Sequence, residues 1–269
     1  MSSTTSSKPA ADGTGPKSEA TPSGTSSLAN QVKTLQFAWF AGHALTVLST
    51  IFFLLTYVRV FPSTYKFWYK LAFLGVIESF GVLIYQSIKK AGVNPKLLLK
   101  DDNVHYLFLA VVLFFYSPYV LLTLSTFALF STFHVLSYSK NVLFPAFGIA
   151  ESHPLSEKVG NFITANNNNS IALASLLEVY TVAWLLVRLI TFRKNSLIPF
   201  LVYVVFIKLR FEKSTFTRNA FKSVELKLEG LINQTGAPAA KNAWVSVKSV
   251  FHQVGSISIV NDYTKEKSI

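Results

Sequence analysis

The sequence predicts an all-α integral membrane protein with four transmembrane helices, a short interfacial or re-entrant segment, and a C-terminal amphipathic helical tail. The run Asn103–Ser139 contains no Lys, Arg, Asp or Glu, and an apolar stretch of about 18 or more residues is typical of a transmembrane helix. Hydrophobic residues make up 51% of the chain and charged residues only 14%, compared with about 25% charged in soluble domains. The net charge of +12 fits contact with anionic lipid and a positively charged cytoplasmic side.

Composition divides the chain into three parts. Residues 1–33 are rich in Ser, Thr, Pro, Gly and Ala, and such a segment cannot bury enough apolar surface to offset the entropy lost on ordering. This N-terminal tail is therefore expected to be disordered. A four-span membrane domain is predicted over residues 34–210, and a cytosolic amphipathic tail over residues 211–269.

The first two spans are expected to insert as an antiparallel hairpin, because only a short aromatic-rich turn separates them. Residues 36–58 carry no charge, whereas residues 68–88 contain Glu78, whose cost of about 2.5 to 3.5 kcal/mol makes that span marginal alone. Small residues recur at four-residue spacing in the first span, which suits close helix contact in membranes, although ordinary packing also explains them. These residues are Ala38, Gly42, Thr46 and Thr50.

The third span contains a proline. A straight helix over Val104–Ser139 would be about 54 Å long, well beyond a hydrocarbon thickness of about 30 Å. Because proline breaks the helical hydrogen-bond ladder, Pro118 favours one kinked helix with an interfacial end, and two short membrane-dipping arms are the alternative. The fourth span is expected over residues 171–191. The apolar run 197–207 is too short to cross and is expected to be interfacial or re-entrant.

Loop charges orient these spans, because cytoplasmic loops carry an excess of Lys and Arg. The N-terminal tail and the second loop are basic, and the C-terminal part begins with Arg193 and Lys194. On the other side, Lys140 and Lys158 are offset by acids. The excess predicts four crossings with both termini in the cytosol.

Beyond residue 211 the chain becomes polar but keeps helical periodicity, which is typical of amphipathic helices. A first apolar face is followed by a Gly-Ala-Pro break and a sharper stripe opposed only by basic and small polar residues. The first face consists of Phe216, Ala220, Val224, Leu228 and Leu231. The second stripe and its basic neighbours, predicted to bind a membrane surface, are Trp244, Val247, Phe251, Val254, Lys241 and Lys248. The alternative is that the two helices cover each other or the membrane domain.

The C-terminus holds a short basic pattern. Lys265 and Lys267 are the fifth and third residues from the end and resemble a cytosolic dilysine signal for retrieval to the endoplasmic reticulum. Such a signal is an address read by a receptor, and chance or simple solubility is the alternative explanation.

Few residues point to chemistry. The five scattered histidines form no motif and no close pair, no catalytic, metal-binding or cofactor-binding pattern occurs, and the lack of cysteine excludes thiolate sites. No nucleic-acid motif accompanies the positive charge. Polar residues inside spans are functional candidates by default, and here these are His43, Glu78 and Glu178. Interhelical hydrogen bonds are their expected role, ahead of a proton or ion path.

Two short stretches carry a resemblance to a known family. They are Ser117-Pro118-Tyr119 and the segment 128–138, which holds Ala128-Leu129-Phe130-Ser131, His134 and Tyr138. With the order of spans over about residues 34–254, they resemble the transmembrane protein 33 family, whose fungal members include a pore-membrane nucleoporin and its endoplasmic-reticulum paralogue. The resemblance implies a non-enzymatic protein of the endoplasmic reticulum and nuclear envelope that acts in membrane shape and in nuclear pore biogenesis or distribution. It also implies reticulon-type or nuclear pore proteins as partners.

The residues themselves predict a related mechanism. A hairpin, a bent third span, a re-entrant segment and an amphipathic tail all add volume to one leaflet, so the protein is expected to shape or sense curved or anionic membrane. A homo-oligomer is compatible with the sequence. Two other functions stay open: an adaptor whose basic tail recruits a cytosolic protein such as a nuclear transport receptor, and a small transporter or channel that uses Glu78 and Glu178.

Overall fold

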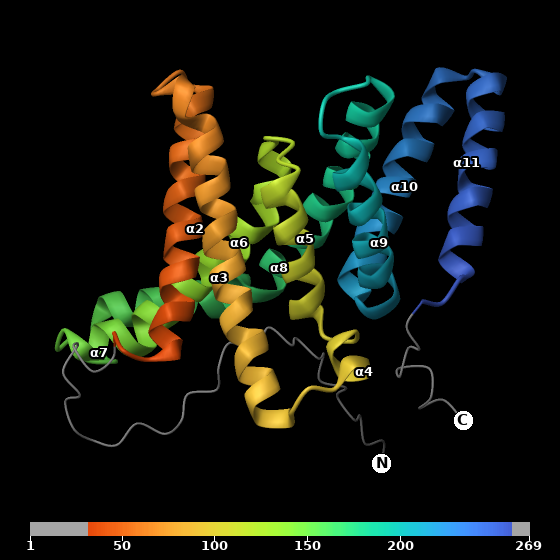
Figure 1. The fold of residues 1–269 in the computed structure, drawn as a ribbon. Coiled ribbons are helices and arrows are strands. Elements are labelled where there is room, and N and C mark those ends of the chain that lie inside the picture. Colours follow the sequence, from red (N-terminus) through yellow and green to blue (C-terminus); the bar gives the residue numbers. More distant parts are fainter. Residues whose placement is uncertain (1–31, 260–269) are drawn as a thin grey trace, which may run out of the picture.

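The structure is a computed structural model that describes residues 32–259, and this part of the chain is helical without strands (Figure 1). Four stretches are long and apolar enough to cross a membrane, namely Leu35–Tyr57, Pro62–Ala91, Leu121–Ala146 and Pro154–Ile190. The predicted all-α membrane protein with four spans and C-terminal helices is confirmed. Lys265, Lys267 and nearly all of the predicted N-terminal tail lie outside the described residues. The helices are α2 (Leu35–Tyr57), α3 (Tyr65–Ala91), α4 (Pro95–Leu98), α5 (Asp102–Phe115), α6 (Leu121–Tyr138), α7 (Phe144–Ala146), α8 (Pro154–Ile190), α9 (Leu197–Lys213), α10 (Thr215–Thr235) and α11 (Pro238–Ser256).

Helices α2 and α3 form the predicted antiparallel hairpin, and their backbones nearly touch. A Cβ added to Gly75 would lie 2.5 Å from the carbonyl oxygen of Gly42, so neither position has room for a side chain. The Thr46 hydroxyl donates to the Ala72 carbonyl oxygen at 3.3 Å and so adds a polar contact across the same face. The small residues of the first span therefore do mediate close contact, as such residues do between helices in membranes.

The third predicted span is two helices rather than one kinked helix. In a straight helix Tyr106 and Phe130 would be about 36 Å apart, yet their ring centroids are 6.0 Å apart, so the chain turns back between α5 and α6. Pro118 forces the preceding residue out of the helical region, and Tyr119 adopts a left-handed φ of 52° that completes the turn. The kinked-helix prediction is wrong. The chain forms two helices, as in the alternative, but the second of them, with its continuation to Ala146, is long enough to cross a membrane.

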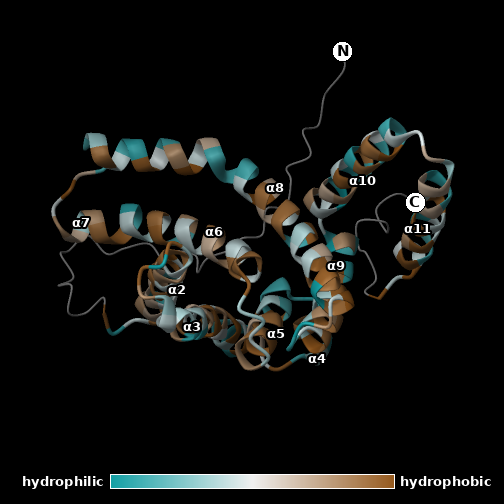
Figure 2. Cartoon of the chain, turned by 90° about the horizontal axis from the view of Figure 1, so that it is seen from above, coloured by the Kyte–Doolittle hydropathy of each residue, from teal (hydrophilic) through white to brown (hydrophobic). Residues whose placement is uncertain are grey.

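Helix α8 is longer than predicted and forms a lateral arm with α6. It starts at Pro154 rather than at Ile171, because His153 caps the helix by accepting from the Leu155 N–H and proline fits the first helical position. Seen from above, the first half of α8 runs beside α6, on the side of α6 that faces away from α2 and α3 (Figure 2), while α6 packs on α2, where Phe40 stacks on Tyr138. The stacked rings of Phe133 and Phe162, 5.9 Å apart, join the two helices of this arm.

The start of α2 and the end of α9 lie at the same end of the molecule. α2 starts beside the end of α3, and Lys213 at the end of α9 pairs with Asp102 at the start of α5, which follows the loop after α3. At the opposite end lie the turns after α2, α5 and α8 (Figure 1). Arg193 and Lys194 belong to the last of these turns, and α9 leads from there to Lys213 beside Asp102.

These three turns share a second property. Among the described residues, every non-glycine residue with a positive φ lies in one of them. These residues are Arg59, Phe61, Tyr119, Phe192 and Asn195.

Candidate functional site

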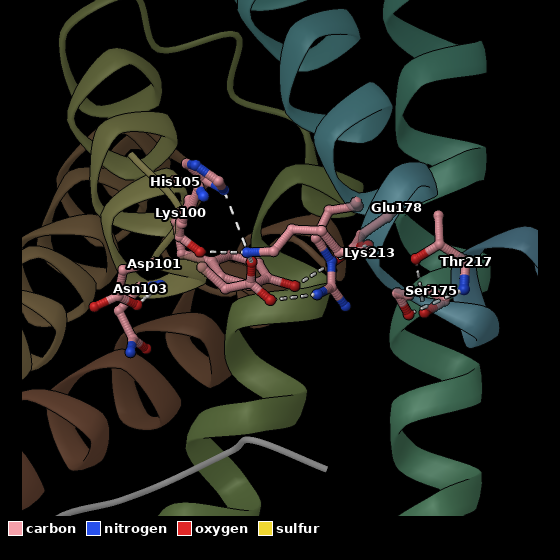
Figure 3. A network of polar contacts seen from close by, with 12 residues as sticks. Lys100, Asp101, Asn103, His105, Ser175, Glu178, Lys213 and Thr217 are labelled. Carbon is pink, nitrogen blue, oxygen red and sulfur yellow. Dashed lines mark hydrogen bonds and ion pairs between the residues drawn. The ribbon is translucent and has the colours of Figure 1, made fainter. Parts of the chain in front are cut away.

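A buried charge network centres on Glu178 of α8. Its side chain is fully buried, and the Tyr106 hydroxyl of α5 donates to its Oε1 at 2.6 Å. Nε of Arg210 on α9 lies 3.6 Å from Oε2, and the Arg210 guanidinium covers the Tyr106 ring at 5.5 Å from its centroid. Helices α5, α8 and α9 therefore meet on one carboxylate (Figure 3).

The same network reaches the surface through Asp102. Nη1 of Arg210 donates to Asp102 Oδ2 at 3.1 Å, and Lys213 pairs with Oδ1 of the same carboxylate (Figure 3). Asp101 caps α5 by accepting from the Asn103 N–H at 2.8 Å, and an acid in the first turn is stabilised by the positive end of the helix dipole. The network therefore fixes α9 against the start of α5. Sequence analysis identified Glu178 but missed its partners, although Arg210 and Lys213 stand out as cations that follow an apolar run.

The structure does not bring the two intramembrane acids together. Glu178 is buried at the junction of α5, α8 and α9, whereas Glu78 is exposed on the outward face of α3. No single path within residues 32–259 is lined by both carboxylates. The arrangement of Glu178 is that of an interhelical contact, as expected from the sequence.

Two histidines meet in the membrane domain. The ring centroids of His43 and His134 are 4.6 Å apart, so the sequence-based statement that the chain holds no close His pair is wrong. His43 Nδ1 is 2.9 Å from the Ser131 hydroxyl, and the Trp39 ring contacts both imidazoles at its edge. Across the described residues, no three His, Asp or Glu side chains are placed to hold a metal ion. The pair joins α2 to α6.

Helix α10 packs against the membrane domain. Ala220 lies in a buried cluster with Val179 of α8 and Ile207 of α9, with Phe221 and Val224 around it. Further along, the predicted apolar face becomes exposed at Leu228 and Leu231, because α10 has passed the end of its contact with α8. Half of this face is therefore covered and half is free.

Helix α11 folds back along α10 through polar contacts. Lys248 Nζ lies 2.5 Å from Glu229 Oε1 and 3.0 Å from Glu225 Oε1, and the Trp244 indole N–H donates to the same Glu229 oxygen at 3.3 Å. Hydrogen bonding to Lys248 lowers the pKa of both glutamates, and the same bonds raise the pKa of Lys248. Trp244 and Lys248, predicted to bind membrane, therefore face α10 in this conformation.

The end of α11 is held by α9. Lys208 Nζ donates to the Gly255 carbonyl oxygen at 3.1 Å and forms an ion pair of 3.0 Å with Glu212. Glu212 Oε1 in turn accepts from the Ile259 N–H at 2.9 Å. Charged side chains thus fasten α11 at its middle and at its end.

An apolar face of α11 stays exposed despite these contacts. Val247, Phe251 and Val254 of the predicted stripe are exposed, with Phe251 at 58%, and Val250 extends the face. Lys241 is exposed at the start of the same helix. Sequence analysis missed Val250 because it lies at the edge of the stripe.

Comparison with known proteins places the chain in a family. A family profile described as transmembrane protein 33/nucleoporin POM33 matches residues 20–256. The chain belongs to the TMEM33/POM33 family. The family resemblance predicted from the sequence is therefore confirmed.

Relatives within the TMEM33/POM33 family match along most of their length. A protein named nucleoporin POM33 from Chaetomium thermophilum is 30% identical over 86% of this chain and 89% of its own length. The pore membrane protein of 33 kDa from Saccharomyces cerevisiae is 33% identical over 80% of this chain and 82% of its own. Tetra-spanning protein 1 from Schizosaccharomyces pombe is 29% identical over 84% and 86%. No solved structure matches the chain.

Proposed function

We propose that this protein shapes or senses curved membrane in the endoplasmic reticulum and nuclear envelope, and so supports nuclear pore biogenesis or distribution and the organisation of the endoplasmic reticulum. The observation that carries the proposal is the exposed apolar face of α11. An apolar helix face beside basic residues is typical of helices that lie in the membrane interface. The names nucleoporin and pore membrane protein among the relatives support a place at the nuclear envelope.

The energetics of this face favour curved membrane. Full burial of a Val or Phe side chain contributes roughly 1.5 to 3 kcal/mol, and shallow insertion contributes less, so the helix binds weakly on its own. Weak apolar insertion depends on packing defects between lipids, which are more frequent where a membrane is curved. Attachment to the spans supplies a high local concentration, so weak binding is sufficient.

The lateral arm of α6 and α8 supports the same function. The first half of α8 lies on the far side of α6 from the α2–α3 hairpin (Figure 2), and it exposes polar residues such as Asn161 and Asn168. A helix with one polar side suits the interface rather than the hydrocarbon core.

The test compares full-length protein in vesicles with a variant of the exposed face. In Val250→Glu/Phe251→Glu, two acids replace exposed apolar side chains, so membrane binding should fall while the fold stays intact. The matched control is Asn242→Glu/Ser249→Glu, which adds the same charge to two exposed positions, seven residues apart, on the side of α11 away from Phe251. Cryo-electron microscopy of the vesicles measures tubes or reduced diameters.

The proposal is supported if the wild type and the control both give tubes or small vesicles, whereas the Val250/Phe251 variant leaves the vesicles smooth. Unchanged vesicles with all three proteins would contradict it. Selective binding of α11 to a purified nuclear transport receptor, lost in the same variant, would then favour the adaptor function.

We also propose that the tail and both termini are cytosolic. The common end of α2 and α9 supports this orientation, because it requires an even number of crossings between them, and the basic loop after α3 lies at that end. A glycosylation acceptor inserted after Gly236 should stay unmodified, whereas one in the turn after α2, at Arg59, should be modified. Replacement of Lys265 and Lys267 by Ser, with loss of retention in the endoplasmic reticulum, tests the proposed retrieval signal.

A further inference from the structure

A carboxylate sits at the centre of the outward face of α3. Glu78 lies midway along Tyr65–Ala91, is exposed, and makes no hydrogen bond or ion pair with any residue in the range 32–259. The other faces of α3 are covered, one by α2 at the Gly42–Gly75 contact and one by α5 through Phe80, whose ring stacks on Tyr106. The face that holds Glu78 is therefore the one that meets lipid.

Lipid is an unfavourable neighbour for this residue. Ionisable side chains within spans almost always face a bundle interior or a partner, because hydrocarbon offers them no hydrogen bond. The surrounding residues have the pattern of a helix–helix seam, since Leu74, Glu78, Gly81 and Tyr85 follow each other at spacings of four, three and four. Leu74 and Tyr85 are exposed, and a Cβ at Gly81 would meet no other atom within 4 Å. A second helix can approach closely at Gly81, one turn from the carboxylate.

We propose that a second copy of this chain covers the face, through α3 packed on α3 about a two-fold axis along the membrane normal. Both copies share one orientation in the membrane, so such an axis places Glu78 opposite Glu78 of the second copy at the same depth. A protonated carboxyl then donates a hydrogen bond to the carboxylate of the other copy, which gives each group a partner of its own kind. Self-association is favoured over a different partner because the fold guarantees this match in depth.

The chain is well suited to a direct test because it contains no cysteine. Single-cysteine variants Leu74→Cys and Gly81→Cys place a thiol on the proposed seam, and Leu48→Cys and Leu54→Cys place one on the exposed face of α2 as matched controls. The full-length protein in proteoliposomes is oxidised and run on a non-reducing gel. We expect a covalent dimer of twice 29.9 kDa with the α3 cysteines and little with those of α2.

Second-site changes test the role of the carboxyl group. Added to Gly81→Cys, Glu78→Leu should reduce the cross-linked fraction roughly tenfold, as expected for loss of an interhelical hydrogen bond, whereas Glu78→Gln should retain it because amides also pair. Glu78→Leu makes the span more apolar, and a single symmetric elution peak in detergent verifies that it folds.

Three results would overturn the proposal. They are equal cross-linking from α2 and α3, no dimer from either α3 cysteine, and a dimer that persists at full yield in Glu78→Leu. A cross-link of Gly81→Cys to a different protein in native membranes, without a dimer in proteoliposomes, would assign the face to that protein and likewise reject a second copy.

Discussion

The molecule contains two helical hairpins held together by opposite means. In the α2–α3 hairpin the backbones meet at Gly42 and Gly75, and the polar contacts are hydroxyl-to-carbonyl hydrogen bonds such as that of Thr46. In the α10–α11 hairpin Lys248 pairs with two glutamates, and the apolar face is left uncovered. Hydrocarbon offers no hydrophobic drive between helices, so close packing of small residues holds the first pair. The second pair depends on charge and is therefore the part able to open.

The largest effect should come from breaking the joint between the two regions. Arg210→Met leaves Glu178 buried without its cation, and removal of one partner of a buried ion pair typically costs about 3 to 5 kcal/mol. Unfolding by SDS titration in mixed micelles measures the loss. The double variant Glu178→Leu/Arg210→Met should recover most of it, because it leaves no unpaired buried carboxylate at this junction. A double variant as unstable as the single one would contradict this role.

A smaller loss should follow from filling the α2–α3 contact. Gly75→Leu places its Cβ 2.5 Å from the Gly42 carbonyl oxygen, so the helices must separate, and overpacking of this kind costs about 1 to 3 kcal/mol. Gly230→Leu is the control, because Gly230 is exposed and a Cβ there meets nothing within 4 Å. Similar unfolding midpoints for the two variants would mean that the hairpin is not held by close backbone contact.

The tail should respond to a change that leaves the membrane domain untouched. Lys248→Met removes both ion pairs to α10, so the middle of α11 should loosen, while its end stays on α9 through Lys208 and α10 stays on α8 through Ala220. Hydrogen exchange should rise in α11 only, and Lys241→Met, which removes an exposed lysine of the same helix, should leave exchange unchanged. Equal acceleration in α10 would show that the two helices open together.

The smallest effect is a pH dependence of the same contact. The pKa values of Glu225 and Glu229 are lowered in the folded chain. Their contribution to the stability of the α10–α11 contact is therefore present above the ordinary glutamate pKa and is lost as pH falls through the lowered values, below about pH 4. Lys248 has a raised pKa, so its contribution is lost only above about pH 10.4. Fluorescence of Trp244, with the three other tryptophans replaced by Phe, should change on acidification, and the change should be absent in Lys248→Met.

Sequence patterns predicted those helices whose position is determined by the local composition of the chain. A charge-free run located α2, a mostly apolar run that includes Glu78 located α3, and the spacing of apolar residues located the stripe of α11. The turn at Pro118 was only one of two predicted alternatives. A proline marks a break in a helix, but the direction that the chain takes after it depends on Tyr119 and on the contact of Tyr106 with Phe130. The candidate site was even harder to predict from the sequence. Glu178, Tyr106 and Arg210 meet across distant parts of the chain, and the side of α11 that faces α10 is set by ion pairs that periodicity cannot reveal.

The left-handed residues in the turns opposite the tail have a consequence for how the protein sits in its membrane. A left-handed conformation costs a non-glycine residue roughly 1 to 2 kcal/mol, and glycine would relieve it. The chain nevertheless keeps Arg59, Phe61 and Phe192 there, the last with 95% of its surface exposed. Basic and aromatic side chains are favoured at the level of the lipid head groups. It follows that these turns anchor the bundle at the level of the head groups and so set its depth in the membrane. The cost of the left-handed backbone is accepted to keep these side chains at that level.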